Sequence, residues 1–147
     1  YGYDFLITAH HSGDAVETML INMLRGSGIA GLQGIQSKQG TTLRPLLNLT
    51  REQIMDIVAE RQLTWREDSS NGSTQYLRNY LRHEILPLLE KKVEHAKSTL
   101  ALTATNVSEA EQYILKQLSV WEATFVKIEN SLIWVSQEGI KEPHTFI

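Results

Sequence analysis

The sequence predicts an α/β protein, with a partial parallel sheet in residues 1–92 and a mainly helical part in residues 93–147. Two short apolar runs, each followed by residues at helical spacing, predict strand-helix units in the first part. The stretch 93–126 contains no glycine or proline, and its Ala, Glu, Lys, Leu and Thr content predicts long helices. We therefore expect two domains that meet near residue 92.

The composition excludes several classes of protein. The 147 residues are 41% hydrophobic with a net charge of -3, which is typical of a soluble globular chain that can bury a core. No apolar run reaches the length of a membrane span, so we expect no membrane partner. Without cysteine the chain has no disulfide framework, thiolate metal site or cysteine nucleophile. It opens on Tyr1 without a signal-peptide pattern, and we expect an excerpt of a cytoplasmic protein.

The first strand-helix unit begins with the run 3–9, whose length is typical of a buried parallel strand. A helix is expected after His10-His11, and Gly26-Ser27-Gly28 predicts where it ends. Its apolar residues recur at the helical period and predict a core-facing stripe, formed by Val16, Met19, Leu20, Met23 and Leu24. The opposite side of this helix holds Asp14, Glu17, Ile21 and Arg25.

The second unit follows a glycine-rich loop over residues 29–40. Residues 41–47 predict a short strand that Pro45 makes edge-like or bent, since proline cannot donate to a ladder. Thr50 and Gln53 have the spacing of a capping box, which predicts a helix that runs to about Gln62.

Three further elements complete the prediction. The polar segment 67–74 predicts a loop. Helical spacing resumes over residues 76–89, where Pro87 should kink or restart the helix. Residues 131–136 predict a last strand.

The first candidate site is the histidine pair at a predicted strand end, followed by two acids on the next helix. Ligands of parallel α/β sheets bind at the carboxyl ends of the strands. Asp14 and Glu17 are three residues apart and could jointly hold an ammonium group or a hydrated Mg²⁺. Two alternatives stay open: acids that merely complement the helix dipole, and a His/Asp/Glu metal site, which lacks a third ligand at a characteristic spacing.

The second candidate site is built from arginines, whose planar fork suits phosphate and carboxylate. Arg78 and Arg82 are four residues apart, a like-charge pair that costs about 0.2 to 0.5 kcal/mol in an isolated helix. We expect an anion to offset it, either an intramolecular carboxylate such as Asp68 or a phosphate. All arginines lie in the first part of the chain: Arg25, Arg44, Arg51, Arg61, Arg66, Arg78 and Arg82.

Three blocks of the sequence together resemble the tRNA(Ile)-lysidine synthase family. They are residues 7–35, residues 43–54, and residues 65–71 with 76–89, in the order and spacing of that family. Because this family belongs to the N-type ATP pyrophosphatases, the resemblance implies a Rossmann-like sheet of the adenine nucleotide alpha hydrolase type. Residues 1–92 would be the downstream part of its catalytic domain. Residues 93–147 resemble the helical linker and the start of its C-terminal domain only loosely.

The resemblance implies an ATP-dependent ligase that modifies tRNA. Members of the family adenylate the wobble cytidine of the isoleucine tRNA with a CAU anticodon, and the ε-amine of lysine then displaces AMP. The implied cofactors are ATP and Mg²⁺, and the implied partners are that tRNA and L-lysine. The implied compartment is the cytoplasm, and a homodimer stays open.

The resemblance also assigns roles to individual residues, and none of them is a metal ligand. The implied roles are nucleotide binding for His10 and His11, lysine binding for Asp14 and Glu17, catalysis for Arg25, and tRNA or phosphate binding for Arg78, Asn79 and Arg82.

Two departures from the family pattern matter. The family's Ser-Gly-Gly-x-Asp-Ser phosphate loop, which binds ATP pyrophosphate with Mg²⁺, is absent from these residues, so we expect this chain to be inactive alone. The family has two adjacent acids after the histidines, whereas this chain has Gly13-Asp14. One negative charge is therefore missing from the implied lysine pocket.

Three rival functions remain for test. A tRNA thiolation enzyme of the same superfamily would commonly use cysteines, and the chain has none. A noncatalytic RNA-binding module would lack the phosphate loop in the full-length protein. A metal-dependent hydrolase would carry a metal that elemental analysis detects.

Overall fold

The computed structural model describes residues 2–66 and 77–141. The predicted loop 67–74, with Asp68, and the predicted helix start at Tyr76 lie outside the described residues. The chain divides into two compact units, Tyr1–Ser108 and Glu109–Ile147. Among the described residues, no helix is both long enough and apolar enough to span a membrane. The assignment of residues 1–92 and 93–147 to different domains stays a prediction.

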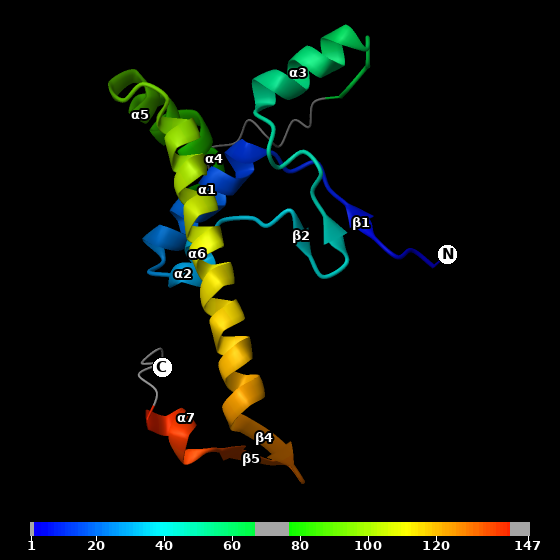
Figure 1. Ribbon diagram of the computed structural model, residues 1–147. Coiled ribbons are helices and arrows are strands. Elements are labelled where there is room, and N and C mark those ends of the chain that lie inside the picture. Colours follow the sequence, from blue (N-terminus) through cyan, green and yellow to red (C-terminus); the bar gives the residue numbers. More distant parts are fainter. Residues whose placement is uncertain (1, 67–76, 142–147) are drawn as a thin grey trace. The chain divides into compact units, whose positions relative to one another are not determined.

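A three-stranded sheet in the first unit carries one parallel pair (Figure 1). Strand β1 (Leu6–Ile7) runs parallel to β3 (Thr42–Leu43), and β2 (Lys38–Gln39) pairs antiparallel with β3. The strand order is β1-β3-β2, so β3 lies in the centre of this sheet. The prediction of an edge-like strand was wrong because Pro45 lies beyond the paired residues and leaves the ladder of β3 intact.

Strand β1 is exposed rather than buried. Leu6 is 59% exposed and Ile7 67%, although both are apolar. A parallel strand is buried when elements cover both faces of its sheet. In the described part of the chain, β1 has a strand neighbour on one side only. The prediction that this run is buried was therefore wrong for these residues.

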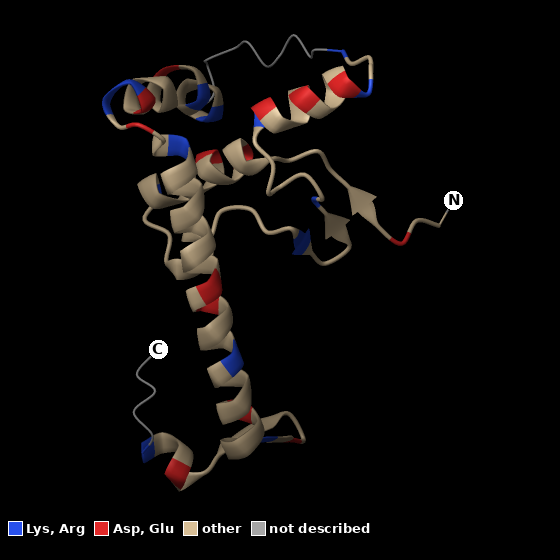
Figure 2. Ribbon diagram, turned by 45° about the horizontal axis from the view of Figure 1, so that its top comes forward, with Lys and Arg blue, Asp and Glu red and all other residues tan. Residues whose placement is uncertain are grey.

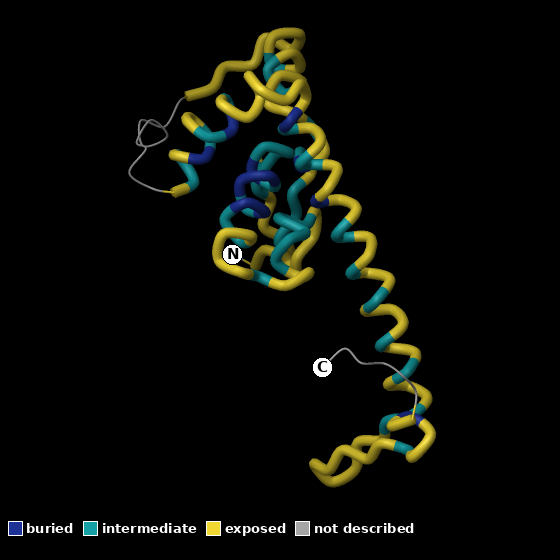
Figure 3. Tube along the Cα trace, turned by 90° about the vertical axis from the view of Figure 1, so that its left-hand side faces the viewer, coloured by how far each residue is buried: buried dark blue, intermediate teal, exposed yellow. Residues whose placement is uncertain are grey.

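Helix α1 (Ser12–Leu24) follows β1 as predicted and ends at Arg25 before Gly26, whose φ of 72° is the left-handed conformation that glycine adopts easily. Its apolar stripe is buried at Val16, Met19 and Leu20, but Met23 and Leu24 are 50% and 65% exposed. The core therefore covers only the first part of the predicted stripe (Figure 3).

The predicted glycine-rich loop contains the short helix α2 (Ile29–Leu32) and β2, which the sequence analysis missed. After α2 the backbone crosses close to α1 at Gly34, where φ is 72°. A Cβ atom built there would lie 2.7 Å from the Ala15 carbonyl oxygen. Only a residue without a side chain allows this approach.

The segment that begins at Leu77 changes its helix type ahead of Pro87. Helix α4 (Leu77–Tyr80) leads into the π-helical turn η2 (Leu81–Ile85), and α5 (Leu86–Lys92) has Pro87 in its first turn. Proline has no N–H and clashes with the preceding turn, so the helix restarts, as predicted. Leu81 and Leu86 form the core of the first unit together with Val16 and Leu20 of α1.

One continuous helix, α6 (Ala96–Phe125), replaces the several long helices that the composition predicted. Its beginning belongs to the first unit, where Leu100 and Ala101 pack against the core. In the second unit a hairpin joins β4 (Val126–Glu129) to β5 (Leu132–Val135), followed by α7 (Gln137–Lys141). Strand β5 confirms the predicted last strand. The left-handed residues Asn130 and Ser131 form the turn.

Helix α3 (Arg51–Glu60) confirms the predicted capping box. The Gln53 backbone N–H donates to Thr50 Oγ1 over 3.2 Å, and the Thr50 N–H donates to Gln53 Oε1 over 2.9 Å. Hydrogen bonds from the Glu52 backbone N–H and from the Thr50 side chain hold the pKa of the Glu52 carboxyl below its ordinary 4.5. The helix start therefore depends on Thr50 in two ways.

Thr50→Ala is expected to lower the free energy of unfolding by about 1 kcal/mol, because the cap is lost. Since the folded-state pKa of Glu52 is lowered, its contribution is present above pH 4.5 and is lost as pH falls through the folded pKa. Chemical denaturation measures the first effect. A carboxyl NMR titration should show the pKa of Glu52 moving back toward 4.5 in the variant.

The control is Thr64→Ala, at an exposed position beyond α3. Equal losses of stability in the two variants would contradict a specific role of the Thr50 cap.

Candidate functional site

The candidate site lies where the parallel strands β1 and β3 end and α1 begins (Figure 1). The Thr8 N–H donates to the Leu43 carbonyl oxygen over 3.0 Å and extends the pairing of β1 with β3 by one residue. The Ser12 N–H donates to the Leu49 carbonyl oxygen over 3.0 Å, so the start of α1 is tied to the segment after β3. His10 and His11 lie between these two anchors, at the edge where α/β proteins bind ligands.

His11 is the N-cap residue of α1. The Gly13 N–H donates to His11 Nδ1 over 3.1 Å, and the His11 N–H donates to Asp14 Oδ2 over 2.9 Å. A Cβ atom at position 13 would lie 2.8 Å from His11 Cε1. The glycine that departs from the family pattern therefore leaves room for the imidazole above the helix end.

His10 has a different partner, because its Nδ1 lies 2.8 Å from the hydroxyl oxygen of Thr8. Sequence reasoning missed Thr8, although a hydroxyl two residues before a strand-end histidine is a visible signal.

The acidic pair of α1 is buried and bound to Arg82. The Arg82 Nε donates to Glu17 Oε1 over 2.6 Å, and Nη2 donates over 2.8 Å to both Glu17 Oε2 and Asp14 Oδ1. The side chains of Glu17 and Asp14 are 2% and 12% exposed. These acids therefore do not lie on a solvated helix face. We call the three residues the Arg82 cluster.

The contacts within the Arg82 cluster stabilise its charged groups. Hydrogen bonding to Glu17 raises the pKa of Arg82 above its ordinary value, which favours the charged guanidinium in these ion pairs. Arg78 adds a second positive charge, with its Nε 3.7 Å from Glu17 Oε2 and its Nη2 donating to Thr18 Oγ1 over 2.7 Å. Among the described residues, the carboxylate of Glu17 thus lies beside both arginines, and that of Asp14 lies beside Arg82. Figure 2 shows the acidic positions on α1 and the basic positions on the α4–α5 segment.

Arg25 is not brought together with these residues. It is exposed at the C-terminal end of α1, and eleven positions of helical rise place its backbone roughly 16 Å from that of Asp14. Asn79 lies on α4 next to Arg78 and is far along the sequence from His10 and His11, which we call the histidine turn.

Arg44 has a structural role that the sequence did not predict. It follows β3 directly, its N–H donates to the Ser37 carbonyl oxygen over 2.8 Å, and its Nη1 donates to the Gln36 carbonyl oxygen over 2.9 Å. It holds the loop before β2 against the end of β3. Its position inside the predicted strand 41–47 gave no signal of this role.

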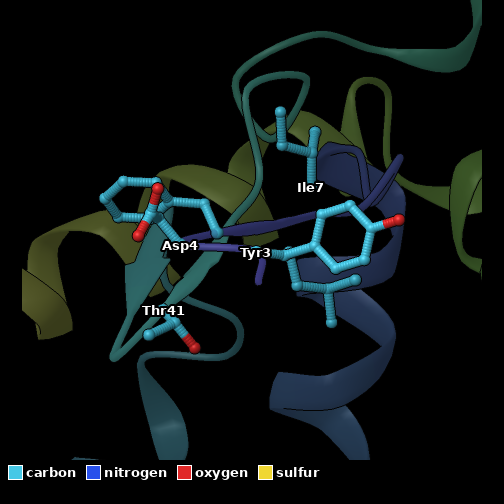
Figure 4. Close-up of a pocket in the computed structure, with 6 residues that line it drawn as sticks. Tyr3, Asp4, Ile7 and Thr41 are labelled. Atoms are coloured by element: carbon cyan, nitrogen blue, oxygen red, sulfur yellow. The ribbon is translucent and has the colours of Figure 1, made fainter. Parts of the chain in front are cut away.

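A shallow pocket lies elsewhere, along the exposed strand β1 (Figure 4). It is lined by Tyr3, Asp4, Phe5, Leu6, Ile7 and Thr41. This mostly apolar lining precedes the histidine pair along β1 and shares no residue with it. We therefore build the candidate site on the hydrogen-bonded turn rather than on this pocket.

The described residues give Mg²⁺ no ready site. No group of three or more His, Asp or Glu side chains among them could hold a metal ion. The strongest pair of potential ligands, Asp14 and Glu17, is bound to Arg82.

Comparison with known proteins places these features in a family. Three relatives carry the name tRNA(Ile)-lysidine synthase. The chain is 37% identical over 113 residues to that of Chlorobaculum tepidum, 43% over 112 residues to that of Parabacteroides distasonis, and 35% over 146 residues to that of Nitrosomonas europaea. These alignments cover 76%, 74% and 95% of the chain, but only 34%, 26% and 31% of the relatives. The chain thus spans about a third or less of their length.

A solved structure shares the fold. The U34-tRNA thiolase NcsA from Methanococcus maripaludis, solved with its [4Fe-4S] cluster, matches 72% of this chain and 37% of its own with a TM-score of 0.53. At 18% identity the likeness concerns the fold alone. The model of the PP-loop domain matches residues 1–89, which include both strand ends, α1 and the Arg82 cluster. Since this is more than half of the 147 residues, the chain belongs to the PP-loop domain family.

Proposed function

We propose that the chain is part of an enzyme that joins lysine to the wobble cytidine of the isoleucine tRNA with a CAU anticodon. ATP adenylates the cytidine and pyrophosphate leaves; the lysine ε-amine then bonds to the cytidine and AMP leaves. The observation that carries this proposal is the 35 to 43% identity, over most of this chain, to proteins named tRNA(Ile)-lysidine synthase. The compartment of this reaction would be the cytoplasm.

The site residues divide between the two substrates. The histidine turn, beside the positive end of the α1 dipole, would face the nucleotide. Asp14, and not Glu17, would face the lysine ammonium, because the Asp14 side chain is 12% exposed and the Glu17 side chain only 2%. Arg78 and Asn79, on α4, would approach phosphate of the nucleotide or tRNA. A homodimer stays a prediction.

Pyrophosphate and Mg²⁺ would be held by the family's phosphate loop, which these residues do not contain. The 147-residue chain by itself is therefore expected not to release pyrophosphate from ATP, because the amides and the Mg²⁺ site that stabilise the leaving group are missing. Release of labelled pyrophosphate by the purified chain, above that of a preparation from cells without it, would contradict this.

The test of the function uses the full natural protein with unmodified tRNA(Ile), ATP and labelled lysine. We expect ATP-dependent incorporation of lysine, with AMP and pyrophosphate released in equal amounts. A tRNA whose wobble cytidine is replaced by uridine is the control and should accept no lysine. Binding of tRNA without incorporation would instead support an RNA-binding module. Lysine-independent hydrolysis that a chelator abolishes would support a metal-dependent hydrolase.

Asp14→Asn in the full natural protein is expected to raise the KM for lysine about tenfold or more and to leave the KM for ATP nearly unchanged. The amide keeps the shape of the carboxylate, and its one oxygen can still accept from the His11 N–H, but its NH2 group cannot accept from Arg82 Nη2. The variant also loses the charge that would hold the ammonium. Steady-state kinetics in which the concentration of each substrate is varied in turn measures the KM for lysine and the KM for ATP.

Asp56→Asn, on the exposed face of α3, is the matched control. An unchanged KM for lysine together with a lower melting temperature in Asp14→Asn would show that Asp14 serves the Arg82 cluster alone.

A further inference from the structure

We propose that a further strand of the full natural protein, from outside these 147 residues, pairs with the free edge of β5 and makes the β4–β5 hairpin part of a larger sheet. This pairing belongs to the second compact unit and does not depend on the proposed reaction. Three observations support it: the side-chain patterns of the two strands, the direction of their backbone groups, and the length of the relatives.

One face of the hairpin is wholly aliphatic and largely uncovered. Directly opposite residues of an antiparallel pair lie on the same face of a sheet. Val126 and Ile128 of β4 lie opposite Val135 and Ile133 of β5 and form this face. Ile128 is 73% exposed and Ile133 is 70% exposed (Figure 3). Because a two-stranded hairpin is marginally stable at best in water, this face requires a cover.

The other face indicates which of the two strands is the inner one. Here Lys127 and Glu129 of β4 lie opposite Trp134 and Leu132 of β5. Strand β5 is therefore apolar on both faces, which is typical of a strand in the interior of a covered sheet. Strand β4 alternates between apolar and charged residues, and charged side chains are common on edge strands because they oppose further pairing. The patterns thus favour β5 as an inner strand and β4 as the edge.

The backbone of β5 offers hydrogen-bonding groups on its free side. The Ser136 N–H donates to the Phe125 carbonyl oxygen over 2.9 Å, so these residues form a hydrogen-bonded pair next to the hairpin ladder. Hydrogen-bonded and non-hydrogen-bonded pairs alternate in an antiparallel ladder, so the N–H and C=O groups of Ile133 and Val135 point away from β4. In the part of the chain that the structure describes, β5 pairs with β4 alone. An added strand would satisfy these groups.

The partner that fits this edge is a strand of the same protein. The alignment with the relative from Nitrosomonas europaea covers 95% of this chain, and the hairpin therefore lies within it, but it covers only 31% of the relative. Most of such a protein is thus available to supply the strand. The second unit contains three lysines, no arginine and six glutamates, and this negative balance disfavours nucleic acid as the occupant.

Amide hydrogen exchange in the full natural protein, followed residue by residue by NMR, tests the pairing. Ile128 and Ile133 are a matched pair, because they lie opposite each other and both direct their N–H away from the other strand. After correction for intrinsic rates, we expect the Ile133 and Val135 amides to exchange at least about tenfold more slowly than the Ile128 amide. Equal rates would overturn the proposal, and so would a slow Ile128 with a fast Ile133.

Matched proline substitutions provide a second test in the full natural protein. Proline removes the N–H, which an edge strand tolerates when that N–H faces solvent and an inner strand does not. Ile133→Pro is therefore expected to lower the melting temperature by several degrees more than Ile128→Pro. Both variants lose the same side chain from the same face, so the difference reports the lost hydrogen bond. Equal shifts would contradict a strand beside β5.

Dilution distinguishes a strand of the same chain from a second copy of the protein. We expect the slow exchange of Ile133 to be independent of protein concentration, with light scattering on the same samples to follow the mass. If the protection of Ile133 decreases as a dimer dissociates, the edge of β5 pairs with a second copy and the proposal is wrong.

Discussion

Arg82→Ala is expected to lower the free energy of unfolding by about 3 to 5 kcal/mol, the cost of leaving a buried charge without its partner. Glu17 is 2% exposed and accepts two hydrogen bonds from Arg82, so its carboxylate would lose both and could not reach water. Asp14 would lose a third. Because Arg82 itself is 27% exposed and Arg78 remains nearby, the lower end of this range applies. Chemical denaturation of the variant measures the loss.

Arg78→Ala is the matched control, since its side chain is 40% exposed and its Nε is 3.7 Å from Glu17. Its loss should stay below about 1 kcal/mol. The salt dependence of tRNA binding distinguishes the two open roles of Arg82. A phosphate contact would reduce the slope by about one when Arg82 is replaced, whereas the ion pairs in the structure predict an unchanged slope at temperatures where the variant is folded.

Gly34→Ala is expected to cost about 2 to 5 kcal/mol. A left-handed φ of 72° costs an L-residue about 1 to 2 kcal/mol, and overpacking adds about 1 to 3. The new methyl group would lie 2.7 Å from the Ala15 carbonyl oxygen, which belongs to the backbone of α1 and cannot swing away. The loop before β2 would therefore move off α1, and thermal unfolding would show the loss.

Gly40→Ala separates the two contributions. Its φ of 57° is also left-handed, but nothing lies within 4 Å of a Cβ built there. We expect it to cost only about 1 to 2 kcal/mol. Equal losses at the two glycines would contradict the contact with Ala15.

The elements that the sequence predicted well carry local signals. The capping box of Thr50 and Gln53 and the glycine that follows α1 each act within a few residues. The residues next to them in the sequence are therefore enough to predict these helix ends. Strand β4 was missed because Val126–Glu129 continues the glycine-free composition of the helix before it. The left-handed turn after it needs no glycine in this chain.

The Arg82 cluster could not be predicted in the same way. Arg82 is 65 residues away from Glu17 along the chain, and no periodicity connects them. From the sequence, the two acids lie on the side opposite the apolar stripe, and an ammonium or Mg²⁺ ligand, the helix dipole or a metal site could explain them. Only the packing of η2 against α1 shows that this side is buried as well. The positions of the acids were thus predictable, and their partner was not.

The π turn also gives this segment one residue more than an α-helical turn would hold. In an α-helix, positions five apart point about 140° away from each other. Leu81 and Leu86 are five apart and yet both are buried, at 4% and 2% exposed, because the Leu86 N–H reaches back to the Leu81 carbonyl oxygen across the wider turn. Deleting one residue between them would leave the two leucines four apart, and α-helical winding would then keep them about 40° from each other, on the same face. Natural variants should therefore tolerate a single-residue deletion in η2 far better than a single-residue insertion, which would rotate Leu86 away from the core.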